Sequence, residues 1–310
     1  MDGILIIDKP GGWTSHDVVA RVRRILREKR VGHTGTLDPF ATGVLVLLVG
    51  RATRLAQFLA GAEKEYAATI RLGFSTDTGD LTGGRRGGGG GGTADCSTLK
   101  LEDLEAALAP LRGEIEQVPP MYSAKKIAGK KLYELARRGE EVERRAVPVR
   151  VSEFEIVADE DGSFSRRNED GTCDVRARVV CSAGTYVRAL AESVGENLNT
   201  GAHLAALRRT RAGEFVLERA VSLEGLPQLV EEGAEFLVPL EAALPRLPSA
   251  HLTAEEARRV RHGAAVASGG GWEDGAHVAL LDERGALLAV GAYDAAASAL
   301  RPRVMLAAEK

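Results

Sequence analysis

The chain has 310 residues, of which 44% are hydrophobic and 27% are charged, and its formal net charge is −3. This length holds one large domain and a small one, and the composition is that of an ordinary globular protein. The apolar run at residues 41–50 is far too short to span a bilayer, and the first residues lack the basic segment of a signal peptide. Three cysteines without CxxC spacing argue against a disulfide framework and a zinc site, so we expect a reduced, cytoplasmic protein without a metal.

The net charge argues mildly against a nucleic-acid binder, which is usually basic, but the charges are unevenly distributed. Basic residues outnumber acidic ones within residues 125–150, which begin with Lys125, Lys126, Lys130 and Lys131. A second basic group consists of Arg208, Arg209 and Arg211. Two interpretations are open for each group: a solvated helix face, or a surface that contacts phosphates.

The first elements in chain order are a strand and a helix. Residues 4–7 form an apolar, β-branched run that predicts a buried strand, and Lys9-Pro10-Gly11-Gly12 is typical of the turn that ends it. Ser15 is a suitable N-cap for a helix whose apolar face repeats through residues 18–26. We expect Gly32 to end this helix.

Residues 32–43 contain three glycines, three threonines, Pro39 and one carboxylate, Asp38. An apolar run at residues 44–49 follows, so Asp38 is expected on a stiff, tightly turned loop beside a buried strand. A charge in such a position is costly to bury without a partner. Asp38 either satisfies backbone N–H groups of the turn or performs chemistry.

Residues 52–59 favour a short helix, and the alternation in residues 66–72 predicts a strand. Tyr66, the first aromatic residue of that strand, is either a core side chain or part of a site. The glycine run at residues 83–92 has high chain entropy and nothing to bury, so residues 83–95 are expected to form a flexible loop.

Leucines at helical spacing predict a helix at residues 101–111, and residues 130–138 favour a basic helix. A strand is expected at residues 175–179, followed by a helix with Arg188 in its first turn. A cation at that end opposes the helix dipole, which suggests a compensating carboxylate, either Asp38 or Asp77, or a function.

The last part of the chain changes in character. Residues 216–247 carry acids, prolines and short apolar pieces, and we interpret them as a connector packed on the first domain, which spans residues 1–247. A small second domain is expected at residues 248–310, where Thr253 and Glu256 form a capping box and two short strands flank Asp282-Glu283-Arg284-Gly285.

Several collinear motifs resemble those of one family. Gly32-His33-Thr34-Gly35-Thr36-Leu37-Asp38-Pro39 is similar to the catalytic motif of the TruB family of bacterial tRNA pseudouridine(55) synthases. Further similar motifs follow in the family's order across residues 3–215: Gly3-Ile4-Leu5-Ile6-Ile7-Asp8-Lys9-Pro10, Lys64-Glu65-Tyr66, Arg71-Leu72-Gly73, Asp77-Thr78-Gly79-Asp80, Pro119-Pro120-Met121-Tyr122-Ser123-Ala124 and Gly184-Thr185-Tyr186-Val187-Arg188. So many motifs in one order are specific evidence, whereas the glycine run is a departure from the family.

The resemblance implies an α+β fold: a catalytic domain with a mixed, mainly antiparallel sheet flanked by helices, and a small RNA-binding barrel of the PUA type at the C-terminus. It implies that Asp38, Tyr66 and Arg188 are catalytic. It implies that Lys9 and Pro10 are mainly structural. His33, Tyr186 and Leu207 would bind the substrate, together with Lys125, Lys126, Lys130, Lys131, Arg208 and Arg209. His33 is alternatively a structural residue that caps the turn.

The implied activity is isomerisation of uridine 55 in the T loop of tRNA to pseudouridine, on a nucleotide turned out of the RNA. No redox or phosphoryl-transfer step occurs, so no cofactor is expected. Asp38 could attack C1′ as a nucleophile or remove the 2′ proton to give a glycal, and the sequence favours neither. Arg188 would lower the pKa of Asp38.

The expected partner is the T stem-loop of tRNA, for a monomer that needs no protein partner and no membrane. Two other functions are kept in competition. One is a guide-RNA-dependent relative, although no docking extension is evident. The other is a protein that chiefly binds or folds tRNA, with catalysis secondary. A glycosidase is disfavoured because no paired acid and base carboxylates are identifiable.

Overall fold

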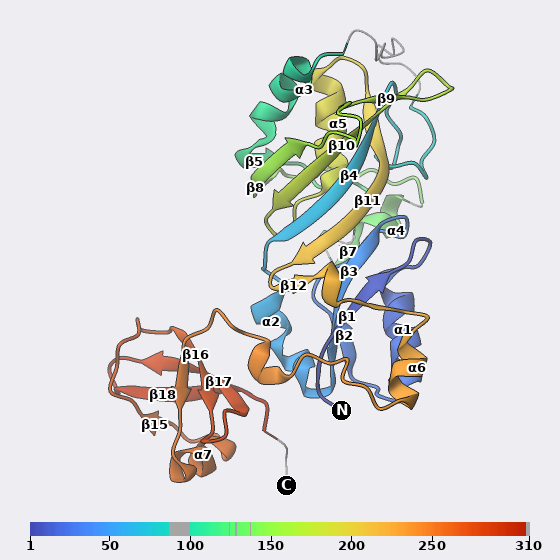
Figure 1. Cartoon of the computed structure of the whole chain (residues 1–310). Coiled ribbons are helices and arrows are strands. Elements are labelled where there is room, and N and C mark those ends of the chain that lie inside the picture. The colour runs from blue at the N-terminus through green and yellow to red at the C-terminus, as the bar shows by residue number, and fades with distance from the viewer. Residues whose placement is uncertain (87–98, 124, 128, 137, 308–310) are drawn as a thin grey trace.

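The protein is described here by a computed structural model that covers residues 1–86, 99–123, 125–127, 129–136 and 138–307. Its main sheet has eleven strands (Figure 1). They are β1 (Gly3–Lys9), β2 (Val31–His33), β3 (Thr42–Val49), β4 (Lys64–Leu72), β5 (Gly113–Gln117), β8 (Val147–Ile156), β9 (Arg166–Arg167), β10 (Cys173–Cys181), β11 (Ala202–Ala212), β12 (Phe215–Val216) and β13 (Val221–Ser222).

The sheet is mixed and mainly antiparallel, as expected. Its order is β13-β1-β3-β11-β4-β10-β8-β5, and β2, β12 and β9 pair with β3, β11 and β10. Only the β1–β13 and β3–β11 pairs among these strands are parallel. The long strands β4, β10 and β11 lie side by side in the middle of Figure 1, so the segments around residues 66, 179 and 207 are neighbours in space.

One face of this sheet holds the largest core. Its apolar side chains alternate along the strands, for example Ala68, Ile70 and Leu72 on β4. Four helices contribute to the same core and cover this face: α1 (Ser15–Leu26), α3 (Leu101–Leu108), α5 (Val187–Asn197) and α6 (Leu226–Glu231). The hydrophobic periodicity of these helices therefore directs them to a common layer.

The opposite face differs along the sheet. On β1 and β3 it is also buried, and Ile4, Ile6, Val44 and Val46 share a second core with η1 (Gly50–Leu55) and η4 (Leu240–Ala242). Strands buried on both faces read as continuous apolar runs, as residues 44–49 do. On β4 and β10 that face instead carries charged side chains that are partly or fully exposed: Glu65, Arg71, Asp174, Arg176 and Arg178.

The N-terminal elements match the sequence prediction with two corrections. The N-cap of α1 is Thr14, which forms a capping box with Asp17, and Ser15 is the first helical residue instead of the cap. The helix ends at Leu26, and Arg27 adopts a left-handed conformation. The expected end at Gly32 is wrong because residues 31–33 pair with β3 as strand β2.

The middle of the chain brings a further correction. The predicted basic helix at residues 130–138 begins only at Leu132, as α4 (Leu132–Ala136). Before it, β6 (Lys126–Ile127) and β7 (Lys130–Lys131) form a small hairpin. The predicted helix at residues 101–111 is α3 followed by η2 (Ala109–Leu111), where Pro110 lies.

The predicted flexible loop, residues 83–95, is described only at its start. There, the Asp77 N–H donates to the Gly84 carbonyl and the Arg86 N–H donates to the Ser75 carbonyl. Residues 87–95 of that prediction lie outside the described residues. Cys181 is a buried free thiol, whereas Cys173 forms a disulfide, which the cysteine count did not lead us to expect.

Residues 249–305 build a five-stranded sheet with one helix, visible in orange and red at the lower left of Figure 1. The order is β14-β16-β17-β18-β15. Its elements are β14 (Ser249–His251), α7 (Ala254–Arg261), β15 (Val266–Ala267), β16 (His277–Leu281), β17 (Leu287–Asp294) and β18 (Ala299–Met305). The predicted capping box of Thr253 and Glu256 is present at the start of α7.

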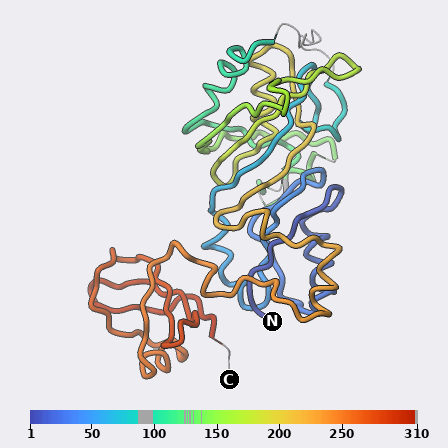
Figure 2. Tube along the Cα trace, in the orientation of Figure 1, coloured from blue at the N-terminus to red at the C-terminus, as the bar shows by residue number. Residues whose placement is uncertain are grey.

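This C-terminal sheet packs on the first part of the chain. Ala279, Leu287 and Val290 belong to the same core as Ile4 and Val44. The Arg51 side chain donates to the Asp2 carboxylate and to the Leu306 carbonyl, and Arg54 donates to the Met305 carbonyl at 2.7 Å. The two ends of the described chain therefore come close together, as Figure 2 shows.

The connecting region, residues 216–247, has little regular structure: η3 (Leu217–Arg219) and α6, besides β13 and η4. The short helix α2 (Ala56–Leu59) follows directly after η1. None of the helices in the described residues is long and apolar enough to cross a membrane.

Candidate active site

The loop that carries Asp38 is held from two sides. The Ser15 hydroxyl, at the start of α1, accepts a hydrogen bond from the Leu37 N–H at 2.9 Å and donates to the Leu37 carbonyl at 3.2 Å. The Gly12 N–H donates to the Pro39 carbonyl at 2.8 Å. Within the loop, the Ala41 N–H donates to the Asp38 carbonyl at 3.1 Å. The backbone on both sides of Asp38 is thereby fixed.

Lys9 also holds the loop that carries Asp38. Its side chain is fully buried, and its ammonium donates to the carbonyls of Pro10, Trp13 and Pro39 at 2.9, 2.6 and 3.1 Å. Burial lowers the pKa of Lys9 to about 8, although the Asp38 charge opposes this shift. These contacts agree with the structural role that the resemblance implies for Lys9.

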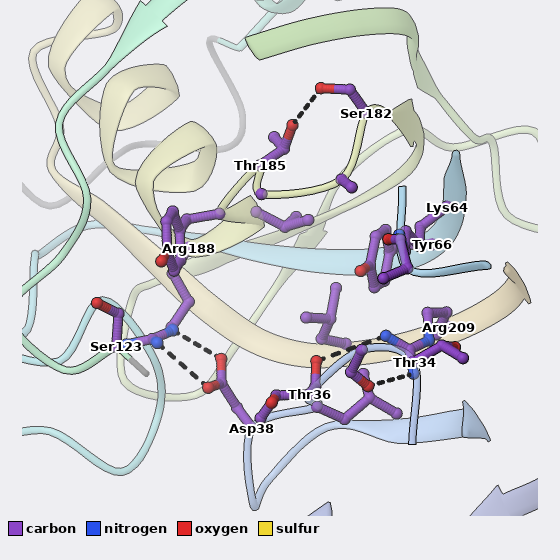
Figure 3. Close-up of a pocket in the computed structure, with 18 residues that line it drawn as sticks. Thr34, Thr36, Asp38, Lys64, Tyr66, Ser123, Ser182, Thr185, Arg188 and Arg209 are labelled. Atoms are coloured by element: carbon purple, nitrogen blue, oxygen red, sulfur yellow. Dashed lines mark hydrogen bonds and ion pairs between the residues drawn. The ribbon is translucent and has the colours of Figure 1, made fainter. Parts of the chain in front are cut away.

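Arg188 pairs with Asp38, one of the two carboxylates that the reversed charge in its helix suggested as a partner. Its Nε donates to Asp38 Oδ2 at 2.8 Å, and its Nη2 lies 3.2 Å from Oδ1 (Figure 3). The other guanidinium donors bind the carbonyls of Thr78 and Tyr122 at 2.7 and 2.6 Å. Four hydrogen bonds from one planar guanidinium are thus used, two to the Asp38 carboxylate and two to backbone carbonyls that hold the guanidinium in place.

The second acid near Arg188 is Asp80 rather than Asp77. Asp80 is 5% exposed, and its Oδ2 lies 3.9 Å from Arg188 Nε. Its other oxygen accepts hydrogen bonds from the Thr78 hydroxyl and from both the N–H and the hydroxyl of Thr82. The motif around Asp77 was noticed in the sequence, but the acid within it that faces the site was not identified.

Burial raises the pKa of Asp38 above the usual value of a carboxyl group. The Arg188 guanidinium opposes this shift, and the Asp80 carboxylate adds to it. We expected Arg188 to hold the pKa low. The attraction is present, but the removal of water from the carboxylate outweighs it.

Asp38 and Arg188 lie between two cavities. The first has a volume of about 320 Å³, and among its lining residues are Lys64, Tyr66, Tyr186, Leu207 and Arg209 (Figure 3). The second, of about 500 Å³, is lined in part by His16, Phe40, Tyr122 and Tyr133. These volumes fall within the usual range of small-ligand pockets, roughly 300–1,000 Å³. The Asp38 side chain is 33% exposed, so its carboxylate is accessible to a bound molecule.

The walls of the first cavity come from strands that the fold brings together. Tyr66 lies on β4 and is 8% exposed, while Leu207 lies on β11 and is 7% exposed. These two strands pair, with Leu207 opposite Ala68. Burial raises the pKa of Tyr66, an effect that the Arg209 guanidinium opposes. The Tyr66 side chain is therefore a neutral phenol at neutral pH.

The sequence suggested that Arg209 belongs to a basic surface, but its side chain is buried. It is 2% exposed and donates to the carbonyls of Val44, Gly35 and Thr36 at 2.6, 3.2 and 3.5 Å. Since side chains alternate along β11, Arg209 points to the same face as Leu207 and holds the Asp38 loop.

Arg208 points to the opposite face. Its guanidinium donates to Asp8 at 2.7 Å and to the Thr42 hydroxyl at 3.2 Å. Arg211 is likewise paired, with Glu63 at 3.1 Å. The expected second basic cluster is thus divided between a buried side chain and ion pairs.

The other residues predicted to bind the substrate differ in whether they line a cavity. Tyr186 lines the first cavity, next to Arg188. His33 is half-buried on β2, and its ring centroid lies 5.5 Å from that of His16. It is not among the residues that line either cavity, and its Nδ1 has no partner among the described residues. Lys125, Lys126, Lys130 and Lys131 lie at the β6–β7 hairpin, just before the Tyr133 that lines the second cavity.

Gln117 was missed by the sequence analysis. It is 6% exposed at the end of β5, and its side-chain oxygen accepts from the Tyr186 N–H at 2.7 Å. Its amide nitrogen donates to the Tyr186 carbonyl at 3.2 Å. Tyr186 is the N-cap of α5 and forms no side-chain capping bond. The Gln117 amide therefore fixes the start of the helix that carries Arg188.

Neither cavity contains a group of metal ligands. Within the described ranges, no cluster of three or more His, Cys, Asp or Glu side chains is arranged to hold a metal ion.

Solved structures define the class of this fold. A structure of an H/ACA RNP bound to a substrate RNA containing 2′-deoxyuridine is similar with a TM-score of 0.72 and 27% identity, covering 99% of this chain and 85% of that chain. A Cbf5-Nop10-Gar1 complex is similar with a TM-score of 0.69 and 29% identity, over 99% of this chain and 84% of that chain. The fold is thus that of the pseudouridine synthases.

Sequence comparisons narrow the class to one family. The model described as TruB family pseudouridylate synthase (N terminal domain) matches residues 23–187, and the tRNA pseudouridylate synthase B C-terminal domain matches residues 188–245. The chain belongs to the TruB family of pseudouridylate synthases.

Curated relatives named tRNA pseudouridine synthase B are similar over most of their length. The one from Thermobifida fusca is 48% identical, over 87% of this chain and 88% of the relative. Those from Bacillus thuringiensis and Mycobacterium bovis are 44% and 43% identical, over 85% and 98% of this chain and 83% and 97% of the relatives.

Proposed function

We propose that this chain isomerises uridine 55 in the T loop of tRNA to pseudouridine. The observation that carries the proposal is the Asp38 carboxylate, paired with Arg188 and accessible from a cavity whose walls include Tyr66 and Leu207. Curated relatives with 43–48% identity carry the name of this activity. A monomer acting in the cytoplasm without a protein partner is part of the same proposal.

The reaction breaks the bond between ribose C1′ and uracil N1, turns the uracil, joins C5 to C1′ and releases the C5 proton. No electrons are gained or lost overall, and the atoms of the uridine are conserved apart from exchange of that proton. One ionised carboxylate is the central group. Asp38 either attacks C1′ or removes the 2′ proton to give a glycal, and both routes require its charged form.

Arg188 would orient the Asp38 carboxylate and favour its charged form. The two hydrogen bonds, one to each carboxylate oxygen, hold the carboxylate in one orientation toward the cavity. The same guanidinium is tied to the Thr78 and Tyr122 carbonyls, so the pair has little freedom to rotate. This is the positioning that a reaction at one sugar carbon requires.

Tyr66 would bind the uracil by stacking, supported by Leu207 on the paired strand. Because burial raises the pKa of its phenol, Tyr66 carries a proton at neutral pH. A phenol in that state is a very weak base for the C5 proton, so stacking and hydrogen bonding are the roles we assign to it.

The RNA must present a uridine that has left its stack. We propose that His33, Tyr186 and the lysines of the β6–β7 hairpin contact the RNA around that nucleotide, and that Arg208 does so after exchanging Asp8 for a phosphate. Residues 248–310, with the sheet β14-β16-β17-β18-β15, would form a PUA-like RNA-binding domain, and residues 1–247 the catalytic domain.

The test is to incubate the full chain with an unmodified tRNA transcript and map pseudouridines along it. The proposal expects conversion at position 55 without any added protein, guide RNA or metal. Conversion elsewhere only, or tight tRNA binding without conversion, would contradict it, and the second result would favour a protein that chiefly binds or folds tRNA.

A further inference from the structure

The exposed face of α1 carries arginines that have no partners in the part of the chain that the structure describes. Arg21 and Arg24 follow one another at helical spacing, and Arg27 comes directly after the helix; all three are exposed. Among the described residues, none of the three forms an ion pair or a side-chain hydrogen bond. Asp17, four residues before Arg21, forms no ion pair with it in the described structure; its Oδ2 instead accepts from the Thr14 N–H and hydroxyl in the capping box.

Many other arginines of this protein are matched with acids. Arg71 binds Asp174 at 2.7 Å, Arg178 binds Glu65 at 3.0 Å, and Arg176 binds Asp159 at 2.6 Å. The chain as a whole is acidic, with a net charge of −3. Arg21, Arg24 and Arg27 have no such partner among the described residues, and it is their grouping along one helix that points to an anionic partner bound from outside.

A groove lies beside these arginines. It has a volume of about 640 Å³ and runs between α1 and residues 223–224; it is lined by Gly12, Trp13, Asp17, Ala20, Arg21, Arg24, Leu223 and Glu224. We call it the α1 groove. Trp13 is 39% exposed, which is unusual for so large an apolar side chain. An exposed aromatic ring next to arginines is the combination on which unpaired bases stack while phosphates are neutralised.

Residues that line the α1 groove are direct sequence neighbours of residues that line the second cavity. Thr14, Ser15 and His16 line the second cavity together with Asp38, and the residues on both sides of them line the groove. In Figure 1, α1 lies at the edge of the main body with α6 beside it. Arg24 lies nine residues after Ser15, about 14 Å further along the helix axis.

We propose that the α1 groove binds the sugar-phosphate backbone of tRNA nucleotides that flank the uridine in the active site, with Arg21 and Arg24 on phosphates and Trp13 against a base or a ribose. This inference rests on the tRNA substrate proposed above. It adds a contact surface that the basic segments found in the sequence do not include.

The first test compares two double variants of the full chain that change the net charge equally. Arg21→Gln with Arg24→Gln alters the groove, and Arg166→Gln with Arg219→Gln is the control, since both control residues are exposed and unpaired among the described residues. Binding of an unmodified tRNA transcript is measured across a salt series. Each lost phosphate contact reduces the slope of log K against log salt by about 1, so we expect a decrease of about 2 and about tenfold weaker binding in the groove variant only.

The rate of pseudouridine formation with saturating enzyme should be unchanged in the groove variant, since neither arginine touches the cavity that holds Asp38. Equal losses of affinity in both double variants would show a general charge effect and overturn the proposal, as would an unchanged slope in the groove variant.

The second test uses the fluorescence of Trp13. The chain has two tryptophans, so Trp272→Phe leaves Trp13 as the only one, with an aromatic ring still available to Tyr293. We expect the tRNA transcript to quench Trp13 emission at the concentrations at which it binds. Quenching by polyglutamate but not by tRNA would assign the groove to an acidic protein and contradict the proposal.

The two proposals fail in distinguishable ways. If wild-type protein releases no label from uracil C5, the proposed function is wrong, whatever the groove does. If wild-type protein releases label, but the groove variant keeps the wild-type salt slope and tRNA does not change Trp13 emission, only the proposal for the α1 groove is wrong.

Discussion

Gln117 lines neither cavity, but substitution of this residue should affect both stability and activity. We predict that Gln117→Met lowers both stability and the rate of pseudouridine formation. Methionine has a similar length but no polar amide, so both hydrogen bonds to the Tyr186 backbone disappear. The Tyr186 carbonyl also accepts from the N–H groups of Ala189 and Leu190. The Tyr186 N–H, in contrast, has no second acceptor among the described residues.

The magnitude follows from these partners. A buried N–H without an acceptor costs about 1–3 kcal/mol, and loss of the second hydrogen bond adds about 1 kcal/mol, so the free energy of unfolding should fall by about 2–4 kcal/mol. For a domain of this size, that corresponds to a decrease in Tm of about 4–16 °C. The start of α5 loosens, and Arg188, two residues later, orients Asp38 less well.

The assay is single-turnover release of label from uracil C5 with saturating enzyme, at a temperature where each variant is folded. Gln117→Glu is the matched control, because it keeps the acceptor for the Tyr186 N–H at a helix N-terminus, where a negative charge is favourable. It should retain more of the rate than Gln117→Met. If Gln117→Met loses stability but keeps the wild-type rate, Gln117 does not position Arg188.

Three further predictions concern pH, the loop and the C-terminal sheet. Because the proposed chemistry needs the charged form of Asp38 and burial raises its pKa, the rate should fall as the pH drops through a value above about 3.9, the ordinary carboxyl pKa. Arg188→Gln should move this acid limb to higher pH, and a limb that does not move would contradict the pairing. Arg209→Met should lower the free energy of unfolding by about 2–4 kcal/mol, because Val44 and Gly35 lose a charged donor. Arg208→Met on the other face should cost less than about 1 kcal/mol, and equal losses in denaturant titrations would show that burial does not distinguish them. Removing residues 248–310 should weaken tRNA binding and also lower Tm, since Ile4 and Val44 lose their neighbours in the shared core; the folded remainder should still convert tRNA at saturating enzyme, and loss of that conversion would place part of the chemistry in the C-terminal sheet.

The pairing of Asp38 with Arg188 could be predicted from the sequence because both residues break a local rule. Asp38 is a charge on a stiff loop beside a buried strand, and Arg188 is a cation at the wrong end of a helix. Each needs a partner, and few candidates exist. The position of Asp80 could not be predicted in this way, because three polar residues of the same motif compete for the same contact.

The alternation along β11 contained a signal that was not used. Leu207 is apolar, so Arg209 two residues later should share its buried face, and Arg208 should face solvent. Treating Arg208, Arg209 and Arg211 as one charged cluster ignored that period. Gln117 is a similar case, since it lies two residues after Ile115 on β5 and so belongs to the face that packs inward.

Other features depend on contacts that are distant in the chain. The end of α1 at Leu26 is set by the pairing of β2 with β3, and a three-residue strand is too short for its periodicity to be recognised. The basic segment after Lys125 divides into a hairpin and a short helix because Leu132 and Leu135 are buried. Local propensity does not specify either outcome.

The central claim is that the charge of Asp38 performs the chemistry. Asp38→Asn keeps the size of the side chain and its tolerance of the turn, while it removes the charge that both routes need. The measurement is paired: equilibrium binding of unmodified tRNA and release of label from uracil C5, in the same preparations. We predict that binding changes by less than about tenfold, or about 1.4 kcal/mol, and that no label is released. Release at a near wild-type rate would contradict the account, and loss of binding together with activity would indicate that Asp38 instead maintains the shape of its loop.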